Sequence, residues 1–299
     1  MLDINVKESE NEAIICGVLA ELDIEEKSTL DGRKYVTGKA SIQLDQEIGG
    51  EVVENVVPVR MFAMKKKNDG TDNGIYKAIM ETKEKFTSLA AAEEPSEASL
   101  VCVRGKIEEN LYIDKRTKAV KSDFQISSNF LNKKRDVDEM GATFSLLGVV
   151  VGDIAMEEKD GEETGRLKVK VFSVGYKGRV NVLDLIVANP SAIAAIQNNW
   201  EKGDTVCATG IVNMTYTTKV WYDEQGFGDP IRRVKTESRK ELIITGGDPN
   251  SMGEDHSYDA NDIKNALAER QVRITEMQEK SMSKPKSKRT SKKSNDFGF

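Results

Sequence analysis

A five-residue, strand-like segment that occurs twice constrains the fold of this chain more than any other feature. Its two copies are Val101–Gly105 (VCVRG) and Val206–Gly210 (VCATG). Each copy follows an apolar run that carries one glycine, Gly17 in the first half and Gly148 in the second. Between the run and the copy, each half has a charged turn, further strands and a stretch of helical spacing. The shared order predicts a tandem duplication of a small β-barrel.

The strands between these landmarks alternate between an aliphatic face and a basic face. In residues 35–42, the even positions are small or aliphatic, whereas the odd positions include Tyr35 and Lys39. The strand expected at residues 52–62 adds Arg60 and Phe62 to the same outer face if its valines point inward. We therefore expect a sheet with one core face and one wet face. The outer face of the matching strand in the second half consists of Arg166, Lys168, Lys170 and Phe172.

Changes in composition divide the chain into two domains and a tail. We expect the first domain at residues 1–132 and the second at residues 142–247, with a charged linker at residues 133–141 between them. In the tail, residues 248–299, apolar residues at helical spacing predict a helix at about residues 259–280. A basic, low-complexity stretch follows, and the chain ends in the sequence Asp296-Phe297-Gly298-Phe299.

Composition restricts the chemistry of the chain. Its 299 residues carry a formal net charge of −6, which argues weakly against a general polyanion binder. The only histidine, His256, lies in a polar stretch and no C-x-x-C pair is present, so we expect no metal, cofactor or catalytic site. Carboxylates cluster in turns, where solubility explains them, and we do not expect an enzyme. We expect the three cysteines to be buried, reduced thiols.

The motifs of the second half resemble those of a known family. The sequence KGD at residues 202–204 precedes V-x-x-x-G at residues 206–210, and W-x-D-x-x-G follows at residues 221–226. This pattern is similar to the fourth strand and following hairpin of bacterial and phage single-stranded DNA-binding proteins, over roughly residues 144–246. The resemblance implies a mainly β chain of two OB-folds in tandem, each a five-stranded Greek-key barrel with a short helix, and a largely disordered C-terminal tail.

The resemblance also implies a function, namely sequence-nonspecific binding and protection of single-stranded DNA in replication, recombination and repair. Such binding needs cations for phosphates and aromatic faces for stacked bases. The tail resembles the mobile C-terminal peptide of the family, which implies that Asp296, Phe297 and Phe299 dock replication proteins. The residues expected to contact nucleic acid are Tyr35, Lys39, Arg60, Phe62, Lys168, Lys170, Phe172, Tyr176, Trp221, Tyr222 and Arg232.

Other interpretations of these residues remain open. Aromatic residues on strands usually belong to the core, although the lysines beside Tyr35 and Phe172 favour an exposed face for these two. The lysine run at residues 65–67 and the arginines at residues 232–233 are also compatible with solvated loop charge. The alternative functions are an OB-fold assembly or adaptor protein, such as a viral structural component in which Trp221 contacts a protein, and RNA binding. The oligomeric state is left open.

Two further expectations concern strength and location. We expect the second domain to bind more strongly, because it carries the family's motifs and the more aromatic hairpin. No apolar run approaches the roughly 18–20 residues of a membrane span, and the N-terminus has no signal-peptide pattern. We therefore expect a cytoplasmic protein, located in the bacterial host if a phage encodes it.

Overall fold

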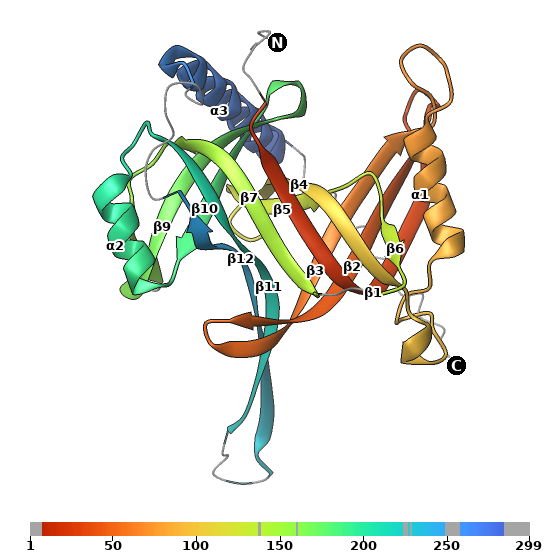
Figure 1. Cartoon of the computed structure of the whole chain (residues 1–299), viewed down its shortest axis with the longest axis horizontal. Coiled ribbons are helices and arrows are strands. Elements are labelled where there is room, and N and C mark those ends of the chain that lie inside the picture. Colours follow the sequence, from red (N-terminus) through yellow and green to blue (C-terminus); the bar gives the residue numbers. More distant parts are fainter. Residues whose placement is uncertain are drawn as a thin grey trace, which may run out of the picture.

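The chain is mainly β, as its alternating segments predict. The structure, a computed structural model, describes residues 8–136, 139–159, 161–223, 227, 229–248 and 258–283. The strands of this part of the chain form one continuous 12-stranded sheet, which curves into two rings (Figure 1). We call the rings the N-terminal ring (β1–β5) and the C-terminal ring (β7 and β9–β12).

Five strands close the N-terminal ring in the order β1-β2-β3-β5-β4-β1. Only the β3–β5 contact is parallel. Inward-facing aliphatic residues such as Ile42, Val59 and Ile126 are fully buried. Helix α1 begins after Asn73, whose side-chain oxygen accepts a hydrogen bond from the Ile75 backbone N–H. The elements are β1 (Asn11–Ser28), β2 (Lys34–Ile48), β3 (Glu51–Met64), α1 (Gly74–Lys85), the 3₁₀ turn η1 (Pro95–Glu97), β4 (Leu100–Ile113) and β5 (Val120–Ser127).

The C-terminal ring repeats this order as β7-β9-β10-β12-β11-β7, again with one parallel contact, between β10 and β12. A helix between the third and fourth ring strands is also repeated. It begins at Pro190, and the Asn189 side chain accepts hydrogen bonds from the backbone of its first turn. The elements are β7 (Gly141–Val150), β8 (Ala155–Lys159), β9 (Glu162–Gly175), the 3₁₀ turn η2 (Tyr176–Gly178), β10 (Arg179–Val187), α2 (Pro190–Asn199), β11 (Thr205–Asp223) and β12 (Ile231–Gly247).

Sheet pairing joins the two rings directly. The first part of β1 lies between β4 and β7 and pairs antiparallel with both. The β2–β3 hairpin reaches across β11, where the fully buried Asn55 donates to the Val212 carbonyl and accepts from the Met214 N–H. Within the segment expected to be a linker, β6 (Asn132–Lys134) pairs with β4. The connection is therefore partly built into the sheet, because its backbone extends the edge of β4.

Glycines of the repeated segments lie where neighbouring backbones come closest. A Cβ atom on Gly105 would lie 2.7 Å from the Ser127 carbonyl oxygen, and one on Gly210 would collide with the Ile243 carbonyl oxygen. Each therefore permits the fourth strand to approach the fifth. Gly17 and Gly148 play the same part between the first and second strands, against the carbonyls of Gln43 and Phe172. The repeated motif thus marks the places where each ring closes.

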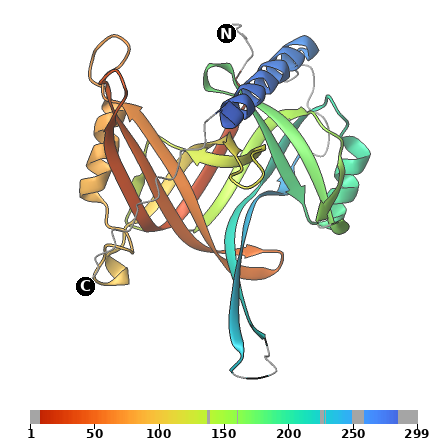
Figure 2. The same ribbon diagram turned by 180° about the vertical axis from the view of Figure 1, so that it is seen from behind.

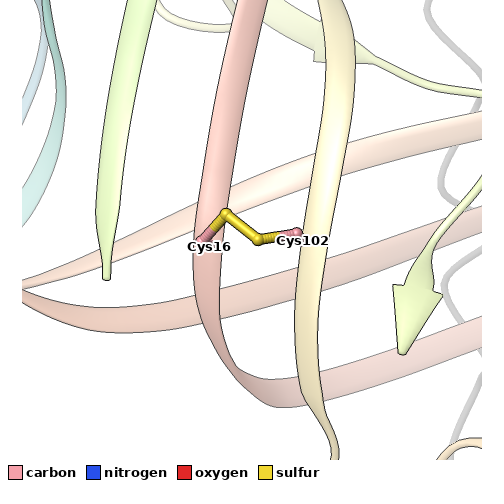
Figure 3. The surroundings of a disulfide bond; sticks show 2 residues. All are labelled: Cys16 and Cys102. Carbon is pink, nitrogen blue, oxygen red and sulfur yellow. A yellow bond between two sulfur atoms is a disulfide. The ribbon is translucent and has the colours of Figure 1, made fainter. Parts of the chain in front are cut away.

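The expectation of three reduced cysteines is wrong for two of them. Cys16 on β1 lies directly opposite Cys102 on β4, with a Cα–Cα distance of 4.2 Å, and a disulfide joins them (Figure 3). Cys207 is a free, half-buried thiol, and burial raises its pKa. The expectation considered each cysteine within its own strand, whereas the disulfide follows from the pairing of two strands that are far apart in the sequence.

The helix expected at about residues 259–280 is present as α3 (Ala260–Ser283), and it lies against both rings. Figure 2 shows it lying across the ribbons of the C-terminal ring. Ala266 is fully buried, and Ile263 and Leu267 pack with Val174 and Val180 of the ring. Apolar residues at helical spacing therefore cover a sheet surface. No helix of the described residues is long and apolar enough to cross a membrane.

Candidate nucleic-acid interface

The outer face of β2 and β3 carries the first group of expected contact residues. The register places Thr37 opposite Phe62 and Lys39 opposite Arg60, so their side chains share one face. Phe62 is 57% exposed and Tyr35 is half-buried. The aromatic rings of Tyr35 and Phe62 lie side by side, with their centroids 5.6 Å apart and their planes tilted by 40°. The alternation in the sequence therefore predicted correctly that all four side chains lie on the outer face of the sheet. The four residues are Tyr35, Lys39, Arg60 and Phe62.

A shallow groove lies on the same face as Tyr35 and Phe62. It has a volume of about 230 Å³, and its lining includes Lys39, Arg60 and, from β1, Asp23 and Glu25. Glu25 pairs with Lys27 at 2.5 Å, and this hydrogen bond lowers the pKa of Glu25. Among the described residues, neither Lys39 nor Arg60 has a carboxylate within ion-pair distance. These two cations are therefore available to an anionic ligand.

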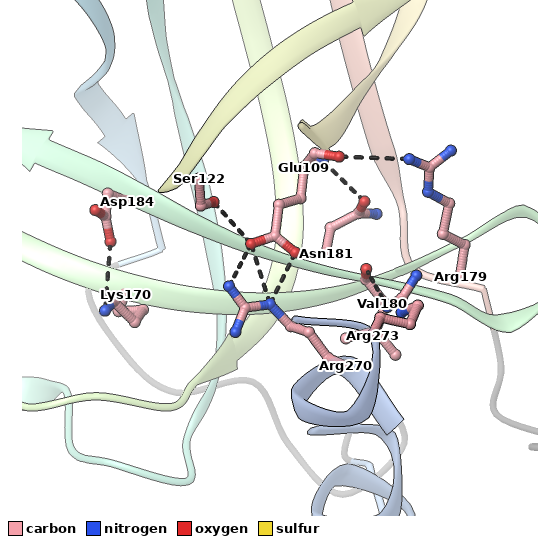
Figure 4. Close-up of polar contacts among 9 residues, drawn as sticks. All are labelled: Glu109, Ser122, Lys170, Arg179, Val180, Asn181, Asp184, Arg270 and Arg273. Carbon is pink, nitrogen blue, oxygen red and sulfur yellow. Dashed lines mark hydrogen bonds and ion pairs between the residues drawn. The ribbon is translucent and has the colours of Figure 1, made fainter. Parts of the chain in front are cut away.

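On the C-terminal ring, the expected cations of β9 already have partners. Lys168 pairs with Asp184 on β10 at 2.7 Å, and Lys170 lies 3.9 Å from the same side chain (Figure 4). Arg166 lies between Glu157 and Glu241, at 2.7 and 2.8 Å. The basic face predicted from the alternation is present, but carboxylates of neighbouring strands offset much of its charge.

Phe172 does not lie on an open face, which corrects the sequence-based prediction. Its side chain points outward from the ring, as the alternation indicated, but it is fully buried. It packs in a separate apolar cluster with Ala266 of α3, and the Tyr258 ring meets it edge-on at 6.4 Å. The side chain is therefore inaccessible to a base because residues from the C-terminal segment cover the outer surface of β9.

Polar contacts hold α3 in this position (Figure 4). Glu109 on β4 is 3% exposed and accepts hydrogen bonds from Arg270 of α3, with the shorter Nε contact at 2.8 Å. The Ser122 hydroxyl donates to the same carboxylate at 2.7 Å. Ser9, before β1, hydrogen-bonds the Tyr258 hydroxyl at 2.8 Å. The C-terminal segment is thus connected to the N-terminal ring as well as to the C-terminal one.

The remaining candidates lie on the β11–β12 hairpin, which extends far beyond the ring (Figure 1). Tyr222 is 62% exposed and lies opposite Arg232. Trp221 points to the other face, and its indole N–H donates to Asp223 at 3.0 Å. Since neighbouring residues of a strand face opposite sides, Trp221 and Tyr222 do not form one stacking surface.

Tyr176 lies in the turn between β9 and β10 and is 73% exposed. The Lys177 ammonium group lies 5.4 Å from the centre of its ring. The docking residues expected at the end of the tail, Asp296, Phe297 and Phe299, lie outside the described residues. Sequence reasoning did not single out Tyr216, an exposed aromatic on the Tyr222 face of the hairpin. The signal available in the sequence was the even spacing between Tyr216 and Tyr222, because residues at even spacing along a strand face the same side.

Comparison with known proteins gives one family and several solved structures. Residues 9–280 match the family model described as YorF. No curated protein sequence matches the chain. The wild-type single-stranded DNA-binding protein from Thermus aquaticus is 14% identical with a TM-score of 0.49, and the match covers 83% of this chain and 96% of that chain. A deletion variant of the Thermus protein is 13% identical with the same TM-score, over 83% and 97%.

Proposed function

The chain belongs to the YorF family, and we propose that it binds single-stranded DNA without strong sequence preference, through the outer face of β2 and β3. The observation that carries this proposal is the pair of aromatic side chains, the half-buried Tyr35 and the exposed Phe62. They lie next to Lys39 and Arg60, two cations without an ion-pair partner among the described residues. Bases of any sequence stack on aromatic rings, and phosphates pair with cations. These are the contacts that binding without sequence readout requires.

We infer that each ring is an OB-fold. The repeated pairing order, with a helix between the third and fourth strands, is compatible with a five-stranded Greek-key barrel whose second and third strands form the ligand face. In the N-terminal ring these strands are β2 and β3, which carry the open basic and aromatic face. In the C-terminal ring they are β9 and β10, where α3 covers Phe172. We therefore propose that the N-terminal ring is the principal site and occludes about 4–16 nucleotides.

The wider role that we propose is coating and protection of DNA strands during replication, recombination and repair. The protein would act by binding and not as an enzyme, and Asp296, Phe297 and Phe299 would recruit replication proteins. These proposals extend the family resemblance of the second half, and they depend on the binding activity itself.

The affinity for single strands and its salt dependence test the proposed function. Fluorescence anisotropy of labelled oligo-dT should show binding that weakens as salt rises, with a slope of about −0.7 for each phosphate contact. For about four contacts, affinity should fall about 50-fold between about 50 and 200 mM salt. Unlabelled oligo-rU and duplex DNA serve as competitors. Equal competition by duplex and single-stranded DNA would show that the proposal is wrong.

A protein-assembly role is the second candidate, and the hairpin favours it. Tyr216, Val220, Tyr222 and Val234 are exposed on one face of the β11–β12 hairpin. Exposed apolar surface of this kind is typical of protein contacts. Trp221 fluorescence in the same titration separates the two functions, because Trp200 is buried and Trp221 is 44% exposed. A change with protein concentration alone indicates assembly through the hairpin, and a change only with oligo-dT indicates that DNA reaches the hairpin.

A further inference from the structure

A basic cavity lies at one end of the N-terminal ring, next to the proposed interface. Two segments form it, the turn between β1 and β2 and the loop between β3 and α1, which lie beside each other in Figure 1. The cavity has a volume of about 750 Å³, and none of the described carboxylates lines it. Its lining residues are Gly32, Arg33, Lys34, Met64, Lys65, Lys66, Lys67, Asn68 and Gly70. Five of these nine residues carry a positive charge, so the cavity suits an anion.

Backbone hydrogen bonds hold these lysines in place. The Lys65 N–H donates to the Lys34 carbonyl at 2.9 Å, which links the two segments. The Lys65 carbonyl in turn accepts from the Asn73 N–H at 3.0 Å, directly before α1. A tight turn closes the loop, where Gly70 has a positive φ of 82° and donates to the Lys67 carbonyl at 3.0 Å. The backbone of the lysine run is therefore fixed by hydrogen bonds, while the side chains of Lys66 and Lys67 remain exposed to solvent.

Carboxylates that pair with these cations lie outside the lining. Arg33, Lys34 and Lys66 each have one carboxylate at 2.7 Å. Hydrogen bonds from Lys34 and Lys66 lower the pKa values of Glu26 and Asp72 respectively, so both acids stay ionised at neutral pH. Among the described residues, Lys67 has no carboxylate within ion-pair distance. Because none of these acids lines the cavity, the donor groups face no carboxylate of the described residues across it.

The cavity continues the proposed DNA-binding face. Met64 lines the cavity and lies directly opposite Tyr35 across the β2–β3 pair. Phe62 precedes Met64 by two residues and faces the same side of the sheet. A strand whose bases stack on Phe62 and Tyr35 would therefore bring its next phosphates to the mouth of the cavity.

We propose that this cavity binds a phosphate group of the DNA strand held on the β2–β3 face, an inference that rests on the proposed function. The group is either an internal phosphodiester or a terminal phosphate, which share the chemistry that ammonium and guanidinium donors recognise. A terminal phosphate carries more negative charge than a diester, because its second pKa lies near 6. The cavity should therefore contribute more to the binding of a terminal phosphate than to the binding of an internal phosphodiester.

Substitution of the lysine run tests the inference. The variant Lys65→Gln/Lys66→Gln/Lys67→Gln removes three charges from the cavity. The control Lys133→Gln/Lys134→Gln/Arg135→Gln removes three charges from β6 and the residue that follows it. In oligo-dT titrations, the slope of log affinity against log salt concentration should be less steep by up to about 2 in the cavity variant. The control should keep the wild-type slope. Equal slopes for the wild type and the cavity variant on oligo-dT with a 5′-phosphate and on oligo-dT with a 3′-phosphate would overturn the inference and leave the proposed function intact.

Oligonucleotide ends identify the source of the phosphate. If the cavity variant weakens binding of 5′-hydroxyl and 5′-phosphorylated oligo-dT equally, the ligand is an internal phosphodiester. If it weakens only oligonucleotides with a 5′- or 3′-phosphate, the ligand is a terminal phosphate. Calorimetry with inorganic tripolyphosphate keeps the two proposals separate. Failure of the wild type to bind oligo-dT contradicts the proposed function, and failure to bind tripolyphosphate as well contradicts the phosphate cavity.

Discussion

Replacing Tyr35 and Phe62 together by alanine should lower the affinity for oligo-dT by about 2–4 kcal/mol, or roughly 30- to 1,000-fold. Each stacked base contributes about 1–3 kcal/mol, and the two effects should not add fully because the rings lie in contact. Neither side chain packs inside the N-terminal ring of strands, so the free energy of unfolding should change little. Anisotropy titration at fixed salt measures the affinity, and thermal unfolding checks the fold.

The matched control for this variant is Phe130→Ala. Phe130 is 50% exposed, close to the 57% of Phe62, and it lies between β5 and β6, outside the β2–β3 pair. Its loss should leave oligo-dT affinity within about 0.5 kcal/mol of the wild type. If the double variant binds oligo-dT as tightly as Phe130→Ala does, the side chains of Tyr35 and Phe62 do not stack on bases, and the β2–β3 face is not the principal site.

Replacing Arg270 by alanine should destabilise the packing of α3 by about 3–5 kcal/mol. The change leaves the Glu109 carboxylate, which is 3% exposed, with the Ser122 hydroxyl but without its cation. Burying an unpaired charge is among the largest single-residue costs in a protein. Local release of α3 limits the effect on global unfolding. The expected result is therefore faster amide hydrogen exchange within residues 260–283 together with a lower urea midpoint.

Arg273→Ala is the control on the same helix. Arg273 makes a 3.4 Å contact to the Val180 carbonyl, and its loss should cost far less than that of Arg270. Adding Glu109→Gln to the Arg270 variant removes the unpaired charge and should recover part of the lost stability. Equal exchange rates in the two arginine variants would show that the buried ion pair does not hold α3.

Alternation within single strands predicted the local geometry well. Tyr35, Lys39, Arg60 and Phe62 share one outer face, because a period of two depends only on neighbouring residues. The repeated VC-x-x-G segments occupy matching positions in the two rings, because their last glycines lie at the close approach of the fourth and fifth strands. Both predictions rest on short-range patterns.

Contacts between distant segments were not predictable in the same way. The periodicity of Ile263 and Leu267 indicated a helix, but nothing in it identified the surface that the helix covers. Phe172 was therefore assigned to an open face, although α3 and Tyr258 bury it. The Cys16–Cys102 disulfide depends likewise on the register of two strands separated by 86 residues.

The structure leads us to propose the opposite order of binding strength for the two rings from the one that the sequence suggested. The second half carries the motifs that resemble single-stranded DNA-binding proteins, and we expected it to bind more strongly. Its lysines on β9 share Asp184, and α3 covers Phe172. In the part of the chain that the structure describes, the face of the first half has two cations without an ion-pair partner, Lys39 and Arg60, and it continues into the basic cavity. A motif thus identified the architecture of a ring more reliably than the exposure of its surface.

Ultraviolet crosslinking of oligo-dT to the whole chain, followed by peptide mapping, tests the central claim most directly. Bases that stack on aromatic rings should crosslink to them, and the account predicts adducts on β2 and β3 at Tyr35 or Phe62. Adducts confined to the C-terminal ring and its hairpin, with none on β2 or β3, would contradict it.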